Sequence, residues 1–299
     1  MATYVTARTV NEALAALATG ARPIAGGTDL VVGGRQGKKP LPDSLVGIHR
    51  LPGFGTIEET ADDLEIGALV THGALAASDL IRARYTGLAD AAAVVGSHAT
   101  RANGTIGGNV MNASPAMDTG APLLCMGAQA ELTSSGGTRV VDLSDLWSGP
   151  RTTSARPDEL LLWIRLPVPP AGTGTSYVRL QYRRQMEIAV VGAGVSVTLE
   201  DGVVARAAIA ITSLAPIIHR VPAAETALAG TDGGPDAVRV AANAAAAAAR
   251  PIDDVRASAD YRRAMAALMT ARAIQAALAR ARGESVAIPA SESTFGNAT

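Results

Sequence analysis

Two glycine-rich stretches hold the residues of this chain that are best suited to binding an anion. The first reads AGGTDL over residues 25–30, and the second reads RANGTIGGNVMNAS over residues 101–114. In the first, Gly26 and Gly27 expose successive backbone N–H groups and Thr28 adds a hydroxyl donor, a combination that suits a diphosphate. Asp29 is itself an anion, so its residue type favours a helix N-cap over a ligand contact.

The second stretch repeats this chemistry with the Thr105 hydroxyl, the amides of Gly107 and Gly108, and the amide of Asn109. Neither stretch is the GxGxxG of doubly wound dinucleotide folds or the GxxxxGK[ST] of phosphate loops. Neither contains lysine, so backbone amides and helix ends would have to meet the phosphate charge. Because 31 of the 299 residues are glycine, either stretch alone is also compatible with an ordinary turn.

The elements around the first stretch follow from spacing. A helix over residues 10–17 stops at Gly20, a short buried strand follows, and AGGTDL is then a strand-to-helix turn. A strand near residues 45–48 and a hairpin over residues 54–66 come next, and then a helix from about residue 69. Residues 79–95 have a helical pattern, and turn-forming residues end it, so the second stretch is predicted to be a loop.

Further along, residues 129–142 are predicted to form two strands and residues 159–167 a third, before a cluster of prolines at positions 167, 169 and 170. Three antiparallel strands then follow, two of them joined by a turn at Asp201 and Gly202, and then two alanine-rich helices. The second helix is predicted to end at Gly283 and to place one set of residues on a common face: Tyr261, Met265, Leu268, Ala271 and Leu278. We therefore expect one domain over residues 1–170 with subdomains of about 1–55 and 56–170, a second over 171–285, and a tail over 286–299.

The composition excludes several classes of protein. With 48% apolar and 18% charged residues the chain can bury a substantial core, and its formal net charge of −1 gives no general attraction to nucleic acid or to anionic membrane. Cys125 is the only cysteine, so neither an intrachain disulfide nor a Cys-ligated zinc or iron–sulfur site can form within the chain. No signal peptide or membrane span is predicted, and we expect a cytoplasmic protein.

The two stretches in this order, together with four downstream segments, resemble a known family. The segments are SPAMDTGAPLLCMGA, DELLLWIRLP, RRQMEIAVVGAGVSVTLEDG and SADYRRAMAALMTARAIQAAL, and the resemblance extends to about Gly283. They are similar to the FAD-binding medium subunit of the xanthine dehydrogenase family of molybdenum hydroxylases. The resemblance implies an α+β chain: an FAD-binding fold of the vanillyl-alcohol oxidase and MurB type, made of two α/β subdomains, and then a C-terminal antiparallel sheet with helices.

The resemblance also implies which residues contact FAD. The acidic residue Asp118 matches one near the adenosine end in the family, where an ionised carboxylate can accept hydrogen bonds from ribose hydroxyls. Arg183 or Arg184 matches a basic position near the flavin, where a cation would favour the reduced anion, although a surface arginine pair is an equal alternative. The implied contact residues are Ile24, Ala25, Gly26, Gly27, Thr28, Asp29, Leu30, Val95, Gly104, Thr105, Ile106, Gly107, Gly108, Asn109, Ser114, Asp118 and Arg184, with no metal ligand and no catalytic acid, base or nucleophile among them.

The implied function is that of an oxidoreductase subunit that carries noncovalent FAD. Electrons would arrive from [2Fe–2S] clusters on a small partner chain, a large partner chain would hold molybdopterin, and the complex would be a heterotrimer or its dimer. His98 is interpreted as a loop or helix-end residue rather than a flavin tether, and Cys125 as a small buried hydrophobe. Thr28 and Asp29 replace the His-Ser of the carbon-monoxide-oxidising branch, which favours an organic substrate.

Two other functions remain open from the sequence. A stand-alone flavin oxidase or reductase of the same fold would act directly on a small molecule and would need a base near the flavin. A nucleotide-binding structural subunit would hold an ADP-like ligand without redox work. The substrate pocket of the complex would belong to a partner chain, and the sequence leaves the final electron acceptor open between NAD, ferredoxin, a quinone and oxygen.

Overall fold

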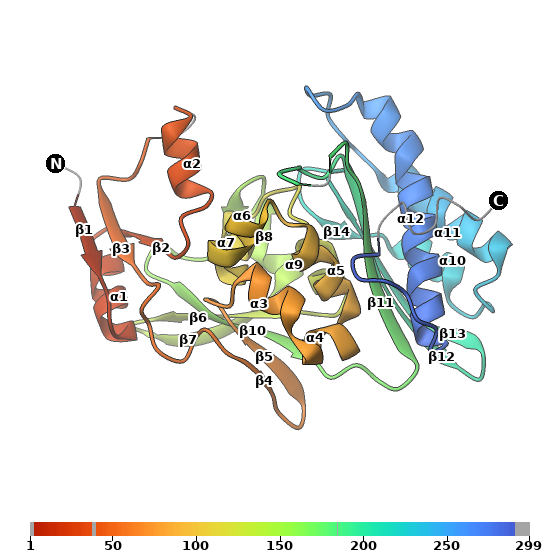
Figure 1. Ribbon diagram of the computed structural model, residues 1–299, viewed down its shortest axis with the longest axis horizontal. Helices are drawn as coiled ribbons and strands as arrows, with labels where there is room; N and C mark the ends of the chain where they lie inside the picture. Colours follow the sequence, from red (N-terminus) through yellow and green to blue (C-terminus); the bar gives the residue numbers. More distant parts are fainter. Residues whose placement is uncertain (1–2, 38–39, 184, 291–299) are drawn as a thin grey trace. The chain divides into compact units, whose positions relative to one another are not determined.

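The computed structural model describes residues 3–37, 40–183 and 185–290, and the chain forms two compact units (Figure 1). Unit 1 contains the described residues up to 72, then 98–113 and 128–168. Unit 2 contains 73–97, 114–127 and the described residues from 169 onward. The chain therefore crosses between the units several times, and segments from both sides of the predicted boundary near residue 170 share unit 2.

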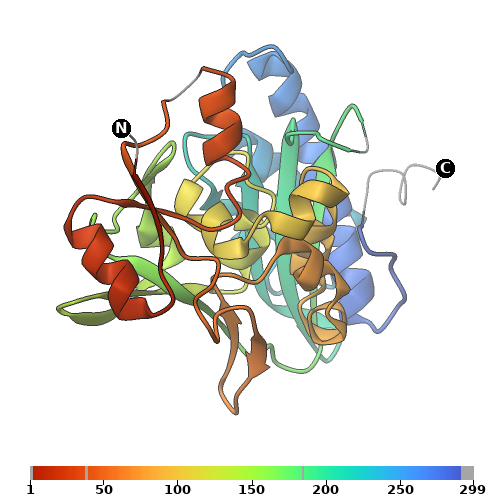
Figure 2. The same cartoon turned by 60° about the vertical axis from the view of Figure 1, so that its left-hand side comes forward.

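Unit 1 is built on a parallel sheet of three strands, an antiparallel sheet of five and a two-stranded ribbon, with the strand orders β1-β3-β2, β4-β5-β10-β6-β7 and β8-β9. Figure 2 shows the small parallel sheet, in red and orange, from a second side. Its strands are β1 (Thr3–Thr6), β2 (Arg22–Ile24), β3 (Ser44–Gly47), β4 (Ile57–Glu59), β5 (Asp63–Gly67), β6 (Gln129–Ser134), β7 (Gly137–Asp142), β8 (Trp147–Gly149), β9 (Thr152–Thr153) and β10 (Leu160–Pro167), and its helices are α1 (Val10–Ala18), α2 (Leu30–Arg35), α6 (His98–Asn103), α7 (Ile106–Asn112) and α9 (Leu143–Leu146).

The first helix shows how local sequence sets this part of the fold. The Thr9 hydroxyl accepts from the amide of Glu12 at 3.2 Å, and the Glu12 carboxylate accepts from the amide of Arg8 at 2.8 Å. These reciprocal contacts satisfy N–H groups that the start of a helix leaves unpaired. Leu14 and Leu17 on the inner face of α1 then pack in one core cluster with Val46 of β3. The parallel sheet is thus held in place by one capped amphipathic helix.

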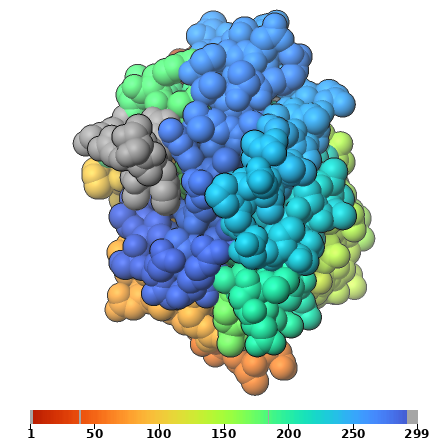
Figure 3. All heavy atoms as spheres, turned by 90° about the vertical axis from the view of Figure 1, so that its right-hand side faces the viewer, coloured from red at the N-terminus to blue at the C-terminus, as the bar shows by residue number. Residues whose placement is uncertain are grey.

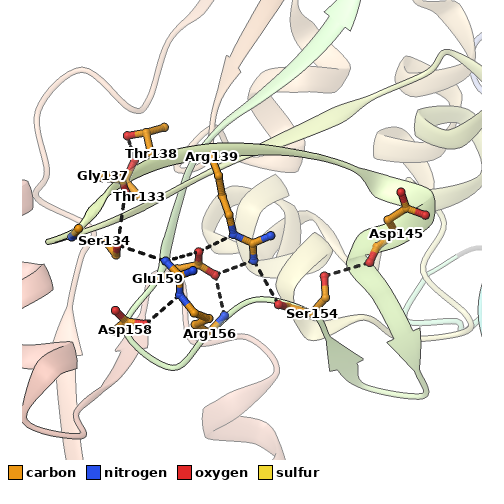
Figure 4. A network of polar contacts seen from close by, with 11 residues as sticks. Thr133, Ser134, Gly137, Thr138, Arg139, Asp145, Ser154, Arg156, Asp158 and Glu159 are labelled. Carbon is orange, nitrogen blue, oxygen red and sulfur yellow. Dashed lines mark hydrogen bonds and ion pairs between the residues drawn. The ribbon is translucent and has the colours of Figure 1, made fainter.

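One end of the five-stranded sheet is fixed by a polar network around Glu159 (Figure 4). The Glu159 side chain is only 1% exposed, and the Arg139 guanidinium donates to both of its oxygens, at 2.6 and 2.8 Å. The backbone amide of Arg156 also donates to this carboxylate at 2.6 Å, and its guanidinium lies 3.0 Å away. The bond from Arg139 is the main cause that lowers the pKa of Glu159. The buried, charge-assisted contacts of this carboxylate therefore stabilise the end of the sheet.

Unit 2 is a four-stranded antiparallel sheet of order β11-β12-β13-β14 with helices on both faces. On one face of the sheet, Val195 and Val197 of β12 belong to the same core as α12. On the other face, the adjacent residue Gly194 packs against the backbone of Ala121 and Pro122 in α8. Helices α11 and α12 form the outer surface seen in cyan and blue in Figure 3. The elements are α3 (His72–Ala77), α4 (Asp79–Arg84), α5 (Thr86–Val94), α8 (Gly120–Cys125), β11 (Thr173–Leu180), β12 (Val191–Glu200), β13 (Val203–Thr212), β14 (His219–Arg220), α10 (Pro222–Leu228), α11 (Pro235–Ala248) and α12 (Ala259–Ala281).

Three details of the prediction were wrong. The helical run over residues 79–95 is two helices, which separate at Tyr85. The second glycine stretch is not a loop, because it contains the second half of α6 and all of α7. The face predicted for α12 is only partly buried: Leu278 is 2% exposed and Met265 and Ala271 pack against the core, whereas Tyr261 is 40% exposed and Leu268 is 41% exposed. Alanines on the real inner face let the helix lie close to the sheet, so bulk was a poor guide to burial.

Several predicted elements are confirmed. The first glycine stretch joins β2 to α2, the β4–β5 hairpin forms, and Asp201 and Gly202 both take positive φ values, of 50° and 79°, in the turn between β12 and β13.

Among the described residues, no helix is long and apolar enough to cross a membrane. No cluster of three or more potential metal ligands was found within the same part of the chain.

Candidate functional site

The first glycine stretch presents a run of backbone donors that the fold does not use. From Gly26 through Asp29, no amide donates to any acceptor among the described residues, although the carbonyls of Gly27 and Asp29 accept from the first turns of α2. Gly27 has a φ of 68°, which turns the chain sharply between strand and helix. Asp29 occupies the N-cap position of α2, but its side chain makes no capping bond. Four successive unused donors in a turn of this kind are of the type that binds an anion.

The second glycine stretch uses its donors internally. The Thr105 hydroxyl accepts from the amide of Gly108 at 3.1 Å and so caps α7. The amide of Gly107 donates to the carbonyl of Ala68 at 3.0 Å, and that of Ile106 donates to Val70 at 2.9 Å. The predicted donation from the Gly107 and Gly108 amides to a phosphate therefore competes with bonds that hold the fold together. Contact between these residues and FAD remains a prediction.

The two stretches meet directly inside unit 1. A Cβ atom added to Gly26 would collide with the carbonyl oxygen of Asn103, and the carbonyl carbon would lie only 2.6 Å away. A Cβ atom on Gly104 would lie 3.2 Å from the Thr28 hydroxyl and 3.4 Å from the ring of His72. Glycine at both positions lets two backbones, almost eighty residues apart in sequence, pack against each other. The two stretches thus form one structure, in which the first supplies the free amides and the second supports them.

We call the place where Gly26 packs against Asn103 and Thr28 against Gly104 the crossing. A pocket of about 410 Å³ opens beside this crossing. Its volume lies within the range of about 300–1,000 Å³ that is usual for small-molecule sites. Both stretches contribute to its wall, as do residues that the sequence analysis did not select. It is lined by Tyr4, Ile24, Ala25, Gly26, His49, Leu69, Thr71, Ala102, Asn103 and Thr105.

A cation and a neutral histidine lie behind the crossing, and the sequence analysis missed both. Arg101 on α6 is buried, and its guanidinium lies 3.2 Å from Nδ1 of His98. His72 is 2% exposed, and its Nδ1 has no hydrogen-bond partner among the described residues. Burial, and to a smaller degree the charge of Arg101, lower the pKa of His72 to about 4. Arg101 is the first residue of the second stretch. That stretch therefore contains a cation, although it contains no lysine.

Three of the predicted contact residues belong to unit 2. Val95 is the C-cap of α5, and the Ser114 hydroxyl accepts from the amide of Ala116 at 3.3 Å. Asp118 is buried, with one carboxylate oxygen accepting from the Tyr177 hydroxyl at 2.8 Å and the other from Arg179 at 2.9 Å. Burial raises the pKa of Asp118, and the contacts with Arg179 and Tyr177 oppose this rise. Each oxygen can accept one further hydrogen bond, and the ribose role of this acid remains a prediction.

The structure also changes which arginine of unit 2 is of interest. Arg184 lies outside the described residues. Arg183 is 68% exposed on its side chain and bonds to Glu187 and to the carbonyl of Met186, as a surface residue would. Arg179, at the end of β11, is buried, and one of its guanidinium nitrogens has no partner among the described residues. Arg179 is therefore a buried arginine paired with Asp118, whereas Arg183 is an exposed one.

Cys125 lies on the inner side of α8, and its thiol donates to the carbonyl of Gly194 at 3.2 Å. Burial raises its pKa above the usual range, which keeps it in the unreactive thiol form. This agrees with its interpretation as a buried hydrophobe.

Unit 1 thus combines a turn of four unused backbone amides with an adjoining pocket that Gly26 helps to line. Residues 1–169 match the family model described as the FAD binding domain in molybdopterin dehydrogenase, and residues 176–277 match the CO dehydrogenase flavoprotein C-terminal domain. The chain therefore belongs to the family of FAD-binding medium subunits of molybdenum hydroxylases, the xanthine dehydrogenase family. This confirms the resemblance and the predicted fold class.

Individual relatives span nearly the whole chain. The carbon monoxide dehydrogenase medium chain of Afipia carboxidovorans is 35% identical over 269 residues, which is 90% of this chain and 93% of that protein. The 6-hydroxypseudooxynicotine dehydrogenase complex subunit alpha of Paenarthrobacter nicotinovorans is 33% identical over 285 residues, covering 93% and 95%. A solved structure of carbon monoxide dehydrogenase from Hydrogenophaga pseudoflava matches with a TM-score of 0.89 at 34% identity, covering 93% of this chain and 98% of that one.

These relatives carry names that differ in substrate while their identities to this chain are almost the same. Overall similarity therefore does not select a substrate, and the preference for an organic one, drawn from Thr28 and Asp29, remains a prediction. The same names describe a medium chain and a subunit of a complex, which favours the multi-subunit interpretation over a stand-alone flavoenzyme.

Proposed function

We propose that this chain is the FAD-carrying electron-transfer subunit of a multi-subunit molybdenum hydroxylase. The observation that carries the proposal is the run of four unused amides from Gly26 to Asp29, packed against the second glycine stretch within a domain of an FAD-binding family. Backbone donors of this kind bind a diphosphate without a lysine, since each N–H bonded to an ionised oxygen forms a charge-assisted hydrogen bond.

Each part of the chain has a defined task in this proposal. Gly26 and Gly27 approach the diphosphate with their amides, and Asn103 and Gly104 hold that turn in position. Arg101, buried behind the crossing, adds a positive potential. In unit 2, Arg179 is ion-paired with Asp118, and the Tyr177 hydroxyl donates to the same carboxylate, so these three side chains hold the sheet of that unit together.

The bound FAD would supply the redox chemistry, since a flavin can take up electrons singly and release them as a pair. A [2Fe–2S] cluster requires four ligands that are mostly cysteine thiolates, and this chain has one buried cysteine. The clusters must therefore lie on a small iron–sulfur subunit, and we place the molybdopterin on a large subunit, in a heterotrimer or its dimer. A cytoplasmic location is part of the proposal and is supported by the cysteine content alone.

The proposal is tested with the full-length chain, first expressed alone and then together with an iron–sulfur chain and a molybdopterin chain. We expect a yellow protein with one FAD per chain, identified after acid release, and a stable complex on co-expression. A folded chain that stays free of flavin after gentle purification and after incubation with FAD would refute the cofactor assignment. A flavin-loaded chain that oxidises a small substrate on its own, and binds no partner, would instead establish the stand-alone enzyme.

A further inference from the structure

We propose that Tyr4 and His49 form the wall that receives the adenine ring of FAD, and that Tyr4 sets the preference for FAD over shorter flavins. This inference rests on the proposed function, because it concerns the same cofactor. Neither residue lies in a glycine stretch, and both line the pocket of about 410 Å³ in unit 1.

The two aromatic side chains converge on one residue that lacks a side chain. A Cβ atom on Gly47 of β3 would collide with the Tyr4 hydroxyl, and it would lie 2.8 Å from Cζ of Tyr4 and 3.3 Å from Cε1 of His49. Tyr4 comes from β1 and His49 follows β3, its parallel neighbour in the sheet. Glycine at position 47 therefore lets the Tyr4 ring lie close over the strand, beside the imidazole. Tyr4 is still 55% exposed, so its ring has open area that a ligand can cover.

The position of the pocket connects this wall to the phosphate site. Gly26 lines the pocket and is also the first of the four unused amides. If a dinucleotide such as FAD places its diphosphate on these amides, one of the two arms attached to that diphosphate enters the pocket. In FAD those arms end in adenine and in isoalloxazine, so the pocket must suit one of these two rings.

The chemistry of the lining favours adenine. The pocket-lining residues include no lysine, arginine, aspartate or glutamate, whereas a reduced isoalloxazine gains negative charge that a nearby cation or strong donor must meet. Adenine is flat and uncharged at neutral pH, and aromatic side chains stack on it readily. The Nδ2 of Asn103 donates to the carbonyl of Ala99 at 3.0 Å, which leaves its Oδ1 able to accept from the exocyclic amine of a purine.

The test compares FAD with FMN, which has the flavin and one phosphate but no adenine. Flavin is removed from the full-length chain, and FAD, FMN and ADP are titrated against the wild type and variants. We expect Tyr4→Leu to raise the Kd of FAD about tenfold, within the range that stacking one base on an aromatic residue gives. It should raise the Kd of ADP by a similar factor and leave the Kd of FMN unchanged.

Three further variants make the result specific. Tyr4→Phe should keep FAD affinity within about twofold, because the ring remains. Gly47→Ala should reproduce the effect of Tyr4→Leu, because its Cβ displaces the tyrosine. Val5→Ala is the matched control: it shortens an equally exposed side chain on the other face of the same strand. Far-UV circular dichroism and urea unfolding check that each variant is folded.

The outcomes separate this inference from the proposed function. Equal loss of FAD and FMN binding in Tyr4→Leu would place the flavin end in the pocket and overturn the inference. Unchanged affinity for FAD, FMN and ADP would overturn it as well. If the wild type bound no FAD, the proposed function would fail first, whatever the variants did.

Discussion

Gly26→Ala tests whether the two glycine stretches form one site. The substitution adds a single methyl group, at a position where the carbonyl carbon of Asn103 would lie 2.6 Å away and its oxygen closer still, whereas ordinary contact begins at 3.4 Å. The atoms in the way belong to backbone, so they cannot rotate aside as a side chain would. The turn from Gly26 to Asp29 and the end of α6 must therefore move apart.

The size of the effect follows from this displacement. Overpacking of a tightly fitted position costs about 1–3 kcal/mol of folding free energy. A hydrogen bond to a charged group contributes about 1.5–3 kcal/mol, so misplacing even one of the four amides should raise the Kd of FAD roughly ten- to 150-fold. We expect the loss of FAD affinity to exceed what the loss of stability alone would produce, since the variant should still fold.

The assay measures bound flavin per chain, the Kd of FAD and the urea unfolding of the flavin-free protein. Gly33→Ala is the matched control, because it adds the same methyl group a few residues away in α2, where a Cβ atom meets nothing within 4 Å. It should leave the Kd unchanged and raise stability by about 0.5–1 kcal/mol, since alanine is the better helix former. A Gly26→Ala protein that binds FAD as tightly as Gly33→Ala would show that the crossing does not form the site.

Three other predictions follow from single residues. Glu159→Gln should cost about 1–3 kcal/mol of stability in urea unfolding, because it weakens the buried contacts to Arg139. The control is Asp158→Asn, at a side chain that is 46% exposed, which should cost under about 0.5 kcal/mol. His72 stays neutral in the folded protein down to its pKa of about 4 but takes up a proton near pH 6.5 when unfolded. The wild type should therefore lose up to about 3 kcal/mol more stability than His72→Gln as the pH falls from 7 to 4, and equal pH profiles would contradict this. Cys125 should resist thiol reagents at pH 8 in the folded protein and react fully in urea, and rapid labelling of the native state would show that α8 does not shield it.

The sequence was most informative where local chemistry decides the structure. The end of α1 before Gly20, the turn after Ile24 and the hairpin at Asp201 and Gly202 depend on residues close to each other in the chain, and their patterns predicted them. The family resemblance rested on motifs of the same local kind.

Long-range packing accounts for the parts that could not be predicted. Gly26 fits against Asn103 and Gly107 against Ala68, and neither partner can be identified from spacing along the chain. The inner face of α12 was identified only in part, for a related reason. Small alanines such as Ala273 allow close approach to the sheet, so the larger Leu268 is left on the outside. Tyr4 gave no signal in the sequence, because only its place over Gly47 distinguishes it from other strand residues.

The two glycine stretches have the same residue types but different physical tasks. In the second, the amide of Gly107 bonds to Ala68, and a Cβ atom there would lie 2.6 Å from both the Cβ and the carbonyl oxygen of that residue. Glycine at 107 is therefore required for packing, and its replacement would unfold the site rather than report on phosphate binding. In the first, the amides from Gly26 to Asp29 have no such partners among the described residues. A buried donor without an acceptor is costly, but these donors border open space, so leaving them free costs the folded protein little and keeps them available to a ligand. This asymmetry is why the phosphates of FAD are expected at the first stretch, with the second acting as its support.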